Sequence, residues 1–395
     1  MLAAQQLGPV AAALRGAGGP GVRLGFAEGL MERDGRRHAA LDTVPGVVFA
    51  RIGAGLAQEA DGRWRTFATG RPRITGRGLL IEGQRTNKVA SRNAAPVDLA
   101  GVVRTGDAAA TLAVVDDTAA LRAAEFGELI DAGVMTGRVL YLDNRAGTAL
   151  AQVRLPGPVG DLTDHTVSLV WRGGGQGRVG TTQTFGSYEV LEGGYVRRAK
   201  IANGLSQTTR VFGLDIQAGA EVWFTLMQLE DGARATSPII TADAAATRGA
   251  DTLTLAVPVV TEMSVSGEVE FTGDAVADQT LIDLHDDDAG RLIVRRLPDG
   301  RLAAEVRTGG VTTSLGSAAR AGARIVRWAV GRAGPDWSLV ADGALIGTAS
   351  VAAPAMTACR IGALRGGSAP LDGYVRRLAF EPVARTVEEL RERTA

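Results

Sequence analysis

The stretch GRGLLIEGQRTN, residues 76–87, decides how the chain around it is interpreted. It combines several glycines, an apolar run at 79–81 and a polar end. A phosphate-binding loop would require a strand, then glycines, then a helix that carries Lys and Ser or Thr. No helical pattern follows here, and Lys88 stands in the wrong place for such a loop. Because Glu82, Arg85 and Asn87 offer charge-assisted and bidentate hydrogen bonds, the stretch predicts a structural joint.

Short β-like segments lie on both sides of this joint. GVVFAR (46–51) and GRWRTFATG (62–70) precede it, and similar segments recur through residues 98–235. In VSLVW, residues 167, 169 and 171 share one face and residues 168 and 170 the other, as expected for a strand. Short strands separated by turns at intervals of roughly ten to fifteen residues predict a sandwich or jelly roll.

A second β-rich region begins near residue 253. The turns PDG (298–300) and ADG (341–343) are typical of hairpins, because Asp-Gly accepts the positive φ of a tight turn. TVEELRERT (386–394) carries Thr386 and Glu389 at capping-box spacing, which predicts a short closing helix. The related phrases LEGGYVRR (191–198) and LDGYVRR (371–377) each indicate a turn followed by a strand, one in each β-rich region.

The predicted fold class is all-β, with two tandem β-sandwich (jelly-roll) domains after a short N-terminal segment. Residues 1–21 would be an anchor or subunit-contact segment, and residues 22–97 a β-rich leader and joint. Residues 98–235 would form the first sandwich, residues 236–252 a linker rich in Ala, Thr and Asp, and residues 253–395 the second sandwich with its closing helix.

The composition of the chain argues against several classes of function. Lys plus Arg and Asp plus Glu both number 43, so the basic excess expected of a nucleic-acid binder is absent. No window reaches the roughly 18 apolar residues of a membrane span, and the N-terminus lacks the pattern of a signal peptide, so a soluble protein is expected. The single cysteine, Cys359, cannot form an intrachain disulfide. His38, His165 and His285 are far apart in sequence, so ordinary histidines are expected in place of a metal site.

Three phrases resemble a known class of protein. GRGLLIEGQRTN resembles the join of phage tail and tail-fibre proteins, in which a phrase G-L-L-I-E-G-x-R-T-N follows a short β-rich leader. QLEDGARATSPIITADAAATRGAD (228–251) resembles a phrase that follows a carbohydrate-module-like sandwich in the same proteins. GEVEFTG (267–273), LVADGALIGTA (339–349) and LDGYVRRLAF (371–380) resemble a concanavalin A-like (laminin-G-like) sandwich.

The resemblance implies a virion structural protein of a phage or gene transfer agent, in a tail fibre or head spike. Such a protein is assembled in the bacterial cytoplasm and mediates attachment to host surface polysaccharide. Its implied partners are other particle proteins, through the N-terminal segment, and further copies of itself, with a trimer expected; neither nucleic acid nor membrane insertion is implied. The alternatives are a polysaccharide depolymerase on the same scaffold and a purely architectural particle component.

Two groups of acidic residues are candidates for catalysis or for metal binding. Glu268 and Glu270 alternate on one predicted strand, as in laminarinase-type glucanases, and alternation places both on one face. The third acid of those enzymes is missing, so no catalytic residue is predicted. In LHDDDAG (284–290), Asp286 and Asp288 are candidate calcium ligands, with a plain acidic hairpin turn as the alternative and no cofactor as the expectation.

Aromatic residues are the candidate sugar contacts. Trp171, Trp223 and Trp328 lie in apolar strand patterns and are predicted to be core residues. Trp337 follows a predicted turn in GPDWSL, and Tyr195 and Tyr374 follow glycines. These three are therefore the predicted ligand-binding residues at the surface.

Overall fold

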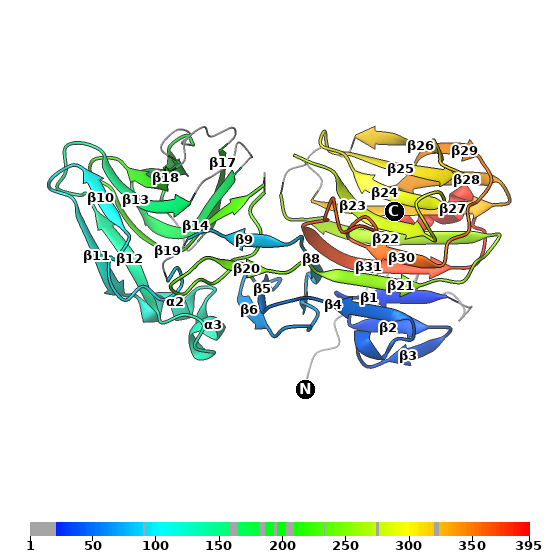
Figure 1. Ribbon diagram of the computed structural model, residues 1–395, viewed down its shortest axis with the longest axis horizontal. Coiled ribbons are helices and arrows are strands. Elements are labelled where there is room, and N and C mark those ends of the chain that lie inside the picture. The colour runs from blue at the N-terminus through cyan, green and yellow to red at the C-terminus, as the bar shows by residue number, and fades with distance from the viewer. Residues whose placement is uncertain are drawn as a thin grey trace. The chain divides into compact units, whose positions relative to one another are not determined.

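The computed structural model describes residues 21–89, 92–158, 165–181, 186–192, 196–202, 209–232, 234–273, 276–319 and 324–395. In these residues nearly all regular structure is antiparallel β-sheet, with only short helices (Figure 1). The predicted all-β fold built from sandwiches is confirmed. The predicted anchor at residues 1–21 lies, apart from its last residue, outside the described residues. No helix in the described part of the chain is long and apolar enough to cross a membrane.

The chain forms two compact units that are nested along the sequence. Unit 1 contains the described residues up to Arg51, together with Gly70–Gly83 and Ala250–Ala395, whereas unit 2 contains Ile52–Thr69 and Gln84–Gly249. These two units do not coincide with the predicted segments 22–97, 98–235, 236–252 and 253–395. The leader is not separate from the sandwiches, because its strands pair with strands of both units, and unit 2 is inserted into unit 1.

Unit 1 is a sandwich of two antiparallel sheets. The β22 sheet has the order β29 (Ala344–Ser350), β28 (Asp336–Ala341), β27 (Ile325–Ala333), β22 (Met263–Phe271), β31 (Gly373–Glu381), β1 (Val22–Gly25), β2 (Leu30–Arg33), β3 (Arg36–His38), with β8 (Gly78–Ile81) joining β31 to β7 (Ile74–Thr75). The β24 sheet has the order β26 (Val311–Ala319), β25 (Arg301–Thr308), β24 (Arg291–Arg296), β23 (Gln279–His285), β30 (Ala358–Ile361), β21 (Thr252–Ala256), β4 (Val47–Ala50). A short 3-10 helix, η1 (Leu41–Thr43), precedes β4.

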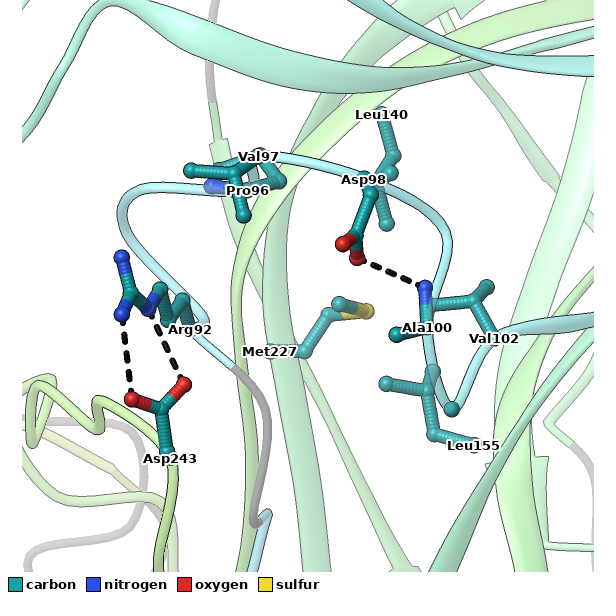
Figure 2. Close-up of a pocket in the computed structure, with 11 residues that line it drawn as sticks. Arg92, Pro96, Val97, Asp98, Ala100, Val102, Leu140, Leu155, Met227 and Asp243 are labelled. Atoms are coloured by element: carbon teal, nitrogen blue, oxygen red, sulfur yellow. Dashed lines mark hydrogen bonds and ion pairs between the residues drawn. The ribbon is translucent and has the colours of Figure 1, made fainter.

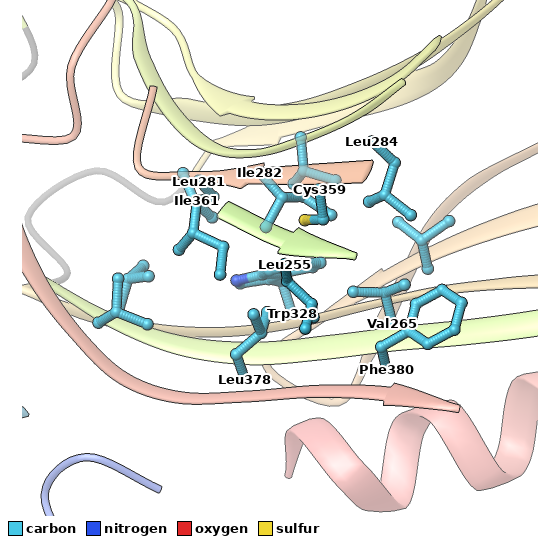
Figure 3. Close-up of a cluster of buried hydrophobic side chains, with 14 of the residues drawn as sticks. Leu255, Val265, Leu281, Ile282, Leu284, Trp328, Cys359, Ile361, Leu378 and Phe380 are labelled. Atoms are coloured by element: carbon cyan, nitrogen blue, oxygen red, sulfur yellow. The ribbon is translucent and has the colours of Figure 1, made fainter. Parts of the chain in front are cut away.

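The core of unit 1 lies between these sheets and draws on both. Figure 3 shows Leu255 of β21, Trp328 of β27 and Leu378 of β31 among the packed side chains. Strand β25 shows the origin of this arrangement: Leu302, Ala304 and Val306 alternate with more exposed residues, so one face of the strand is apolar. Trp328 is 1% exposed, which confirms its predicted core position.

Unit 2 is a second, smaller sandwich. The β12 sheet has the order β11 (Thr111–Asp116), β12 (Arg138–Asp143), β19 (Glu221–Asp231), β14 (His165–Gly174), β17 (Val196–Ala202). The β13 sheet has the order β10 (Val103–Gly106), β13 (Ala151–Pro158), β18 (Thr209–Ile216), β15 (Gln176–Thr181), β16 (Glu189–Val190). The remaining elements are the helices α2 (Thr118–Ala123) and α3 (Gly127–Asp131), the hairpin β5 (Gly55–Gln58) with β6 (Trp64–Phe67), and the pair β9 (Arg85–Asn87) with β20 (Ala246–Arg248).

Apolar side chains of unit 2 pack on both faces of the β12 sheet. Val167, Leu169 and Trp171 of β14 belong to the core between the two sheets, as their alternation predicts. Val170, which points the other way, belongs to a second cluster with Leu121 of α2 and residues of α3 and β6. The helices and the β5–β6 hairpin thus cover part of the outer face of this sheet.

The opening stretch is confirmed as a structural element without a phosphate loop. Leu79, Leu80 and Ile81 are buried in β8, and a strand, β9, follows in place of a helix. Within unit 1, the guanidinium of Arg73 donates to Glu82 Oε2 at 2.7 Å and to Asp251. Arg51 Nη1 lies 3.4 Å from Asp251 Oδ1, and all four side chains are almost fully buried. We call these four residues the buried ion network.

Within unit 2, Asn87 at the end of the same stretch is also fully buried. Its amide nitrogen donates to the carbonyl oxygens of Met227 and Ile239 at 3.2 and 3.0 Å. Its amide oxygen accepts from the backbone N–H groups of Val89 and Leu229, each at 3.1 Å. The short polar side chain therefore satisfies backbone groups that would otherwise be buried without partners.

The predicted linker at 236–252 is a partly buried segment with defined hydrogen-bond partners. Glu230 accepts a hydrogen bond from the backbone of Thr236, and Gln228 Oε1 accepts one from Ile239 N at 2.7 Å. Residues 246–248 then form β20 against β9. Its composition suggested a linker, but polar side chains of β19 hold its backbone in place.

The predicted turns and closing helix are confirmed. Asp342 and Gly343 both have positive φ, 45° and 75°, between the paired strands β28 and β29. Helix α4 (Val387–Thr394) begins at Thr386, which forms the capping box with Glu389. The phrases LEGGYVRR and LDGYVRR lead into β17 of unit 2 and β31 of unit 1.

Candidate functional site

Two of the three predicted surface aromatics, Trp337 and Tyr374, are buried. Trp337 is 0% exposed, and its indole Nε1 donates to the Val351 carbonyl at 3.1 Å. Gly334 and Pro335 form the whole turn and β28 begins at Asp336, so Trp337 is already an inward position of the strand. Tyr374 is 2% exposed, and the guanidinium of Arg77 lies 4.1 Å from the centre of its ring. Tyr195 lies outside the described residues.

Glu268 and Glu270 both lie on β22 but are held by arginines. Glu268 accepts from Arg376 at 2.6 Å and from Arg327 at 3.1 Å, and Glu270 accepts from Arg77 at 2.6 Å. Burial raises the pKa of Glu268, but the hydrogen bonds from Arg327 and Arg376 outweigh it, so the pKa lies below its usual value. A general acid needs the opposite shift, so Glu268 lacks the raised pKa of a glycosidase acid.

The acidic loop at 284–290 also forms ion pairs. Asp286 Oδ1 accepts from the hydroxyl of Thr357 at 2.8 Å, and Asp288 Oδ1 lies 3.1 Å from Arg365 and 3.5 Å from Arg291. The described residues contain no group of three or more His, Cys, Asp or Glu side chains placed to hold a metal ion. The expectation of no cofactor, with calcium as the alternative, stays a prediction.

The strongest candidate site lies on the outer face of the β12 sheet in unit 2. Three neighbouring strands place one side chain each in register: Tyr141 of β12 pairs with Trp223 of β19, and Trp223 pairs with Arg172 of β14. The next residue across, on β11, is Ala113. Tyr141 and Trp223 are both half-buried. We call these four residues the aromatic row.

The side chains of the aromatic row stack along the direction that crosses the strands. The rings of Tyr141 and Trp223 lie 4.5 Å apart between centroids, with 26° between their planes. The guanidinium of Arg172 lies 5.5 Å from the ring centre of Trp223 on the neighbouring strand, and it donates to Asp117 at 2.6 Å. Trp223 is therefore held between two planar groups. Tyr141 stacks on Trp223, and its register neighbour on β11 is Ala113, whose side chain is a single methyl group.

Charged groups follow on the same face, two register positions further along these strands. Asp143 of β12 pairs with Glu221 of β19, and both carboxylates are about a quarter exposed at 24% and 22%. The phenol of Tyr141 donates to Glu221 Oε2 at 2.5 Å. Arg145 donates to Asp143 at 2.7 Å and lies 3.4 Å from Glu221. The half-buried ring of Tyr141 thus lies beside two carboxylates and a guanidinium.

The protonation states of this site follow from its contacts. Burial and the hydrogen bond to Glu221 raise the pKa of Tyr141, so the phenol stays a neutral donor. The hydrogen bond from the Arg145 side chain lowers the pKa of Asp143 to about 2, so Asp143 stays a carboxylate. Near neutral pH the site therefore offers both acceptors and donors beside an aromatic face.

Sequence reasoning did not select this site. The predicted core position is confirmed for Trp171, which is 1% exposed, but Trp223 is half-buried on the outer face. In the mostly apolar run VWFTLM (222–227) the sequence does not indicate which face of the sheet each residue occupies. The alternation Val139, Tyr141, Asp143 in RVLYLD was the available signal, since it makes one face of β12 increasingly polar.

No family model matches the sequence, and no curated protein matches it. Solved structures that match part of this chain include the CBM40 module of a Ruminococcus gnavus IT-sialidase bound to α2,3-sialyllactose, with a TM-score of 0.31, 18% identity, and coverage of 35% of this chain and 84% of that one. Domain 4 of the arabinanase AbnA from Geobacillus stearothermophilus has a TM-score of 0.31, 13% identity, and coverage of 37% and 73%. A pentraxin from Limulus polyphemus has a TM-score of 0.27, 13% identity, and coverage of 35% and 72%. Each of these similarities covers about a third of the chain.

Proposed function

We propose that this protein is a glycan-binding structural component of a phage or gene transfer agent particle, in a tail fibre or head spike. It would bind host surface polysaccharide without cleaving it. The main support for glycan binding is the aromatic row, in which the half-buried Tyr141 lies beside charged groups that form hydrogen bonds. The particle context rests on the resemblance of residues 76–87 and 228–251 to phage tail proteins.

The chemistry of a sugar fits this arrangement. A pyranose ring has one face of C–H groups, which packs on an aromatic ring, and an edge of hydroxyl groups. Ala113, the register neighbour of Tyr141 on β11, has a small side chain, so we place the sugar ring against Tyr141 on that side. The hydroxyl edge would then meet Asp143, Glu221 and Arg145, which act as acceptors and donor.

A single contact of this size binds weakly, and the particle context makes weak binding effective. Several copies on one particle turn later binding events into intramolecular ones, which raises the overall affinity by orders of magnitude. A homo-oligomer, with a trimer as the expected state, would serve this purpose. Residues 1–21 would contact other particle proteins.

The test is a pull-down of the purified full-length chain on host cells with and without their capsule. Tyr141→Ala is expected to weaken capsule-dependent binding roughly tenfold or more, as truncation of an aromatic anchor commonly does. Tyr188→Ala is the matched control: Tyr188 is also half-buried in unit 2, but Arg178 of the β13 sheet lies beside it, 4.7 Å from its ring centre. Equal binding by both variants would refute the role of the aromatic row.

Released reducing sugar, measured in the same tubes, separates the alternatives. Binding without sugar release is expected, because the arginines around Glu268 and Glu270 keep both acids in ion pairs. Sugar release that is lost in Glu268→Gln would replace this proposal with a depolymerase. Absence of any binding to capsulated cells would leave the purely architectural role.

A further inference from the structure

A pocket of about 490 Å³ opens in unit 2, at a place separate from the aromatic row. Its volume lies within the range of small-molecule sites, roughly 300–1,000 Å³. The segment 96–102, which precedes β10, forms one wall. Figure 2 shows Leu140, Leu155 and Met227 at the cavity, and these come from strands of both sheets. The pocket thus reaches the apolar core between the β12 and β13 sheets.

The mouth of this pocket is charged. Arg92 donates through Nε and Nη2 to the two carboxylate oxygens of Asp243, both at 3.0 Å (Figure 2). Asp98 accepts from the backbone N–H of Ala100 at 2.8 Å. Hydrogen bonding to Asp243 raises the pKa of Arg92, and the same contact lowers the pKa of Asp243. The mouth therefore presents a fixed ion pair and a carboxylate above an apolar floor.

A buried asparagine holds the parts of the pocket together. Asn93, which is 1% exposed, donates to the carbonyl oxygens of Met227 and Ile239 at 3.1 and 2.9 Å. Its amide oxygen accepts from Thr241 N at 2.9 Å. Asn93 thereby connects the segment that carries Arg92, the strand that carries Met227 and the segment that leads to Asp243. A pocket whose walls are tied in this way is preorganised for a ligand.

The lining determines what kind of ligand fits. None of the residues that line the pocket is aromatic, so a sugar ring cannot stack here as it can on the aromatic row. The floor suits a small apolar substituent, and the mouth suits an amide and hydroxyl groups. An acetamido group has both parts: a methyl group and an N–H that donates to a carboxylate.

We propose that this pocket binds the acetamido group of an N-acetylated amino sugar, with the methyl group against Leu155 and Met227. The amide N–H would donate to Asp98, and ring hydroxyls would contact Arg92 and Asp243. This inference rests on the proposed glycan binding and names the sugar class that the protein selects. Burial of a methyl group together with one hydrogen bond favours the acetamido sugar over the parent hexose by about tenfold or more.

The test uses the full-length protein labelled with ¹³C at the methionine methyl groups. The methyl glycosides of N-acetylglucosamine, N-acetylgalactosamine and N-acetylmannosamine are titrated against those of the three parent hexoses. The Met227 signal, assigned by its loss in Met227→Leu, is expected to shift with at least one acetamido sugar and about tenfold less readily with its parent hexose. Asp98→Ala, at an exposed position, and Leu155→Phe, which fills the floor, are expected to weaken that response about tenfold.

Three results would overturn the inference in different ways. If capsule binding depends on Tyr141 but no acetamido sugar moves the Met227 signal, the pocket assignment fails and the proposed function stands. If the protein binds neither capsule nor any of the glycosides, both fail. An acetamido response that persists unchanged in Asp98→Ala and in folded Leu155→Phe would also refute the pocket as the binding place.

Discussion

The buried ion network of unit 1 leads to a sharp prediction for Asp251→Asn. Asp251 accepts from Arg73 and from the backbone N–H of Glu82 at 3.0 Å, and Arg51 lies 3.4 Å away, all fully or almost fully buried. The substitution keeps the size of the side chain but leaves two buried arginines with one carboxylate. Removing one partner of a buried ion pair costs about 3–5 kcal/mol. Unit 1 is therefore expected to lose that much free energy of unfolding.

The single cysteine provides the assay for this prediction. Cys359 is 2% exposed in the core of unit 1, and burial raises the pKa of its thiol, so it reacts with a thiol reagent only when unit 1 opens. Where opening is a rapid pre-equilibrium, a loss of about 3–5 kcal/mol raises the labelling rate roughly two to four orders of magnitude. The rate is measured in native buffer by stopped labelling and mass spectrometry.

The control makes the same chemical change at the surface of the same unit. Asp299 pairs with Arg301 in an exposed turn, with both side chains about half exposed at 51% and 46%. Asp299→Asn is expected to leave the labelling rate of Cys359 nearly unchanged, because exposed ion pairs contribute little. A rate in Asp251→Asn that matches the rate in Asp299→Asn would refute the claim that the buried ion network stabilises unit 1.

Three further predictions follow from other contacts. The pKa of Asp143, about 2, lies below its usual value of 3.8, so the stability that its carboxylate contributes is present above pH 4 and is lost as the pH falls from about 4 to 2. In Asp143→Asn the urea midpoint of unit 2 should therefore depend less on pH over that range. Trp337→Ala should lower the free energy of unfolding of unit 1 by about 3–5 kcal/mol, which is measured as faster labelling of Cys359. An unchanged labelling rate would contradict the buried position of Trp337. Asn93→Ala should destabilise unit 2 by about 1–3 kcal/mol and lower its melting temperature, because the Thr241 N–H loses its acceptor in the interior; an unchanged melting temperature would contradict this.

Predictions based on local pattern agreed with the structure where the physical cause is local. The Asp342–Gly343 turn depends on positive φ at those two residues, and the α4 start depends on two side chains three residues apart. Strand β14 shows the same: its inward and outward residues follow from the two-residue repeat alone. For such features the neighbours in sequence are also the interacting partners.

Predictions about exposure were less successful because exposure depends on packing from elsewhere in the chain. Tyr374 follows a glycine, yet Arg77, almost 300 residues earlier, covers its ring. Trp223 lies in an apolar run, yet its register against Tyr141 and Arg172 places it on the outer face. Both outcomes were decided by strands that are distant in sequence.

The sequence by itself thus determined the all-β class, the hairpin turns and the closing helix, since each rests on propensities and short-range hydrogen bonds. It also indicated the structural nature of residues 76–87, although Glu82 and Asn87 there bond partners that are distant in the chain. Only the tertiary structure decided the nesting of unit 2 within unit 1, the aromatic row and the pocket beside Asn93. The physical reason is that antiparallel pairing brings together strands far apart in the chain, and the register of that pairing sets which side chains meet. Tyr141 and Trp223 are 82 positions apart, and only the pairing of β12 with β19 makes them one site.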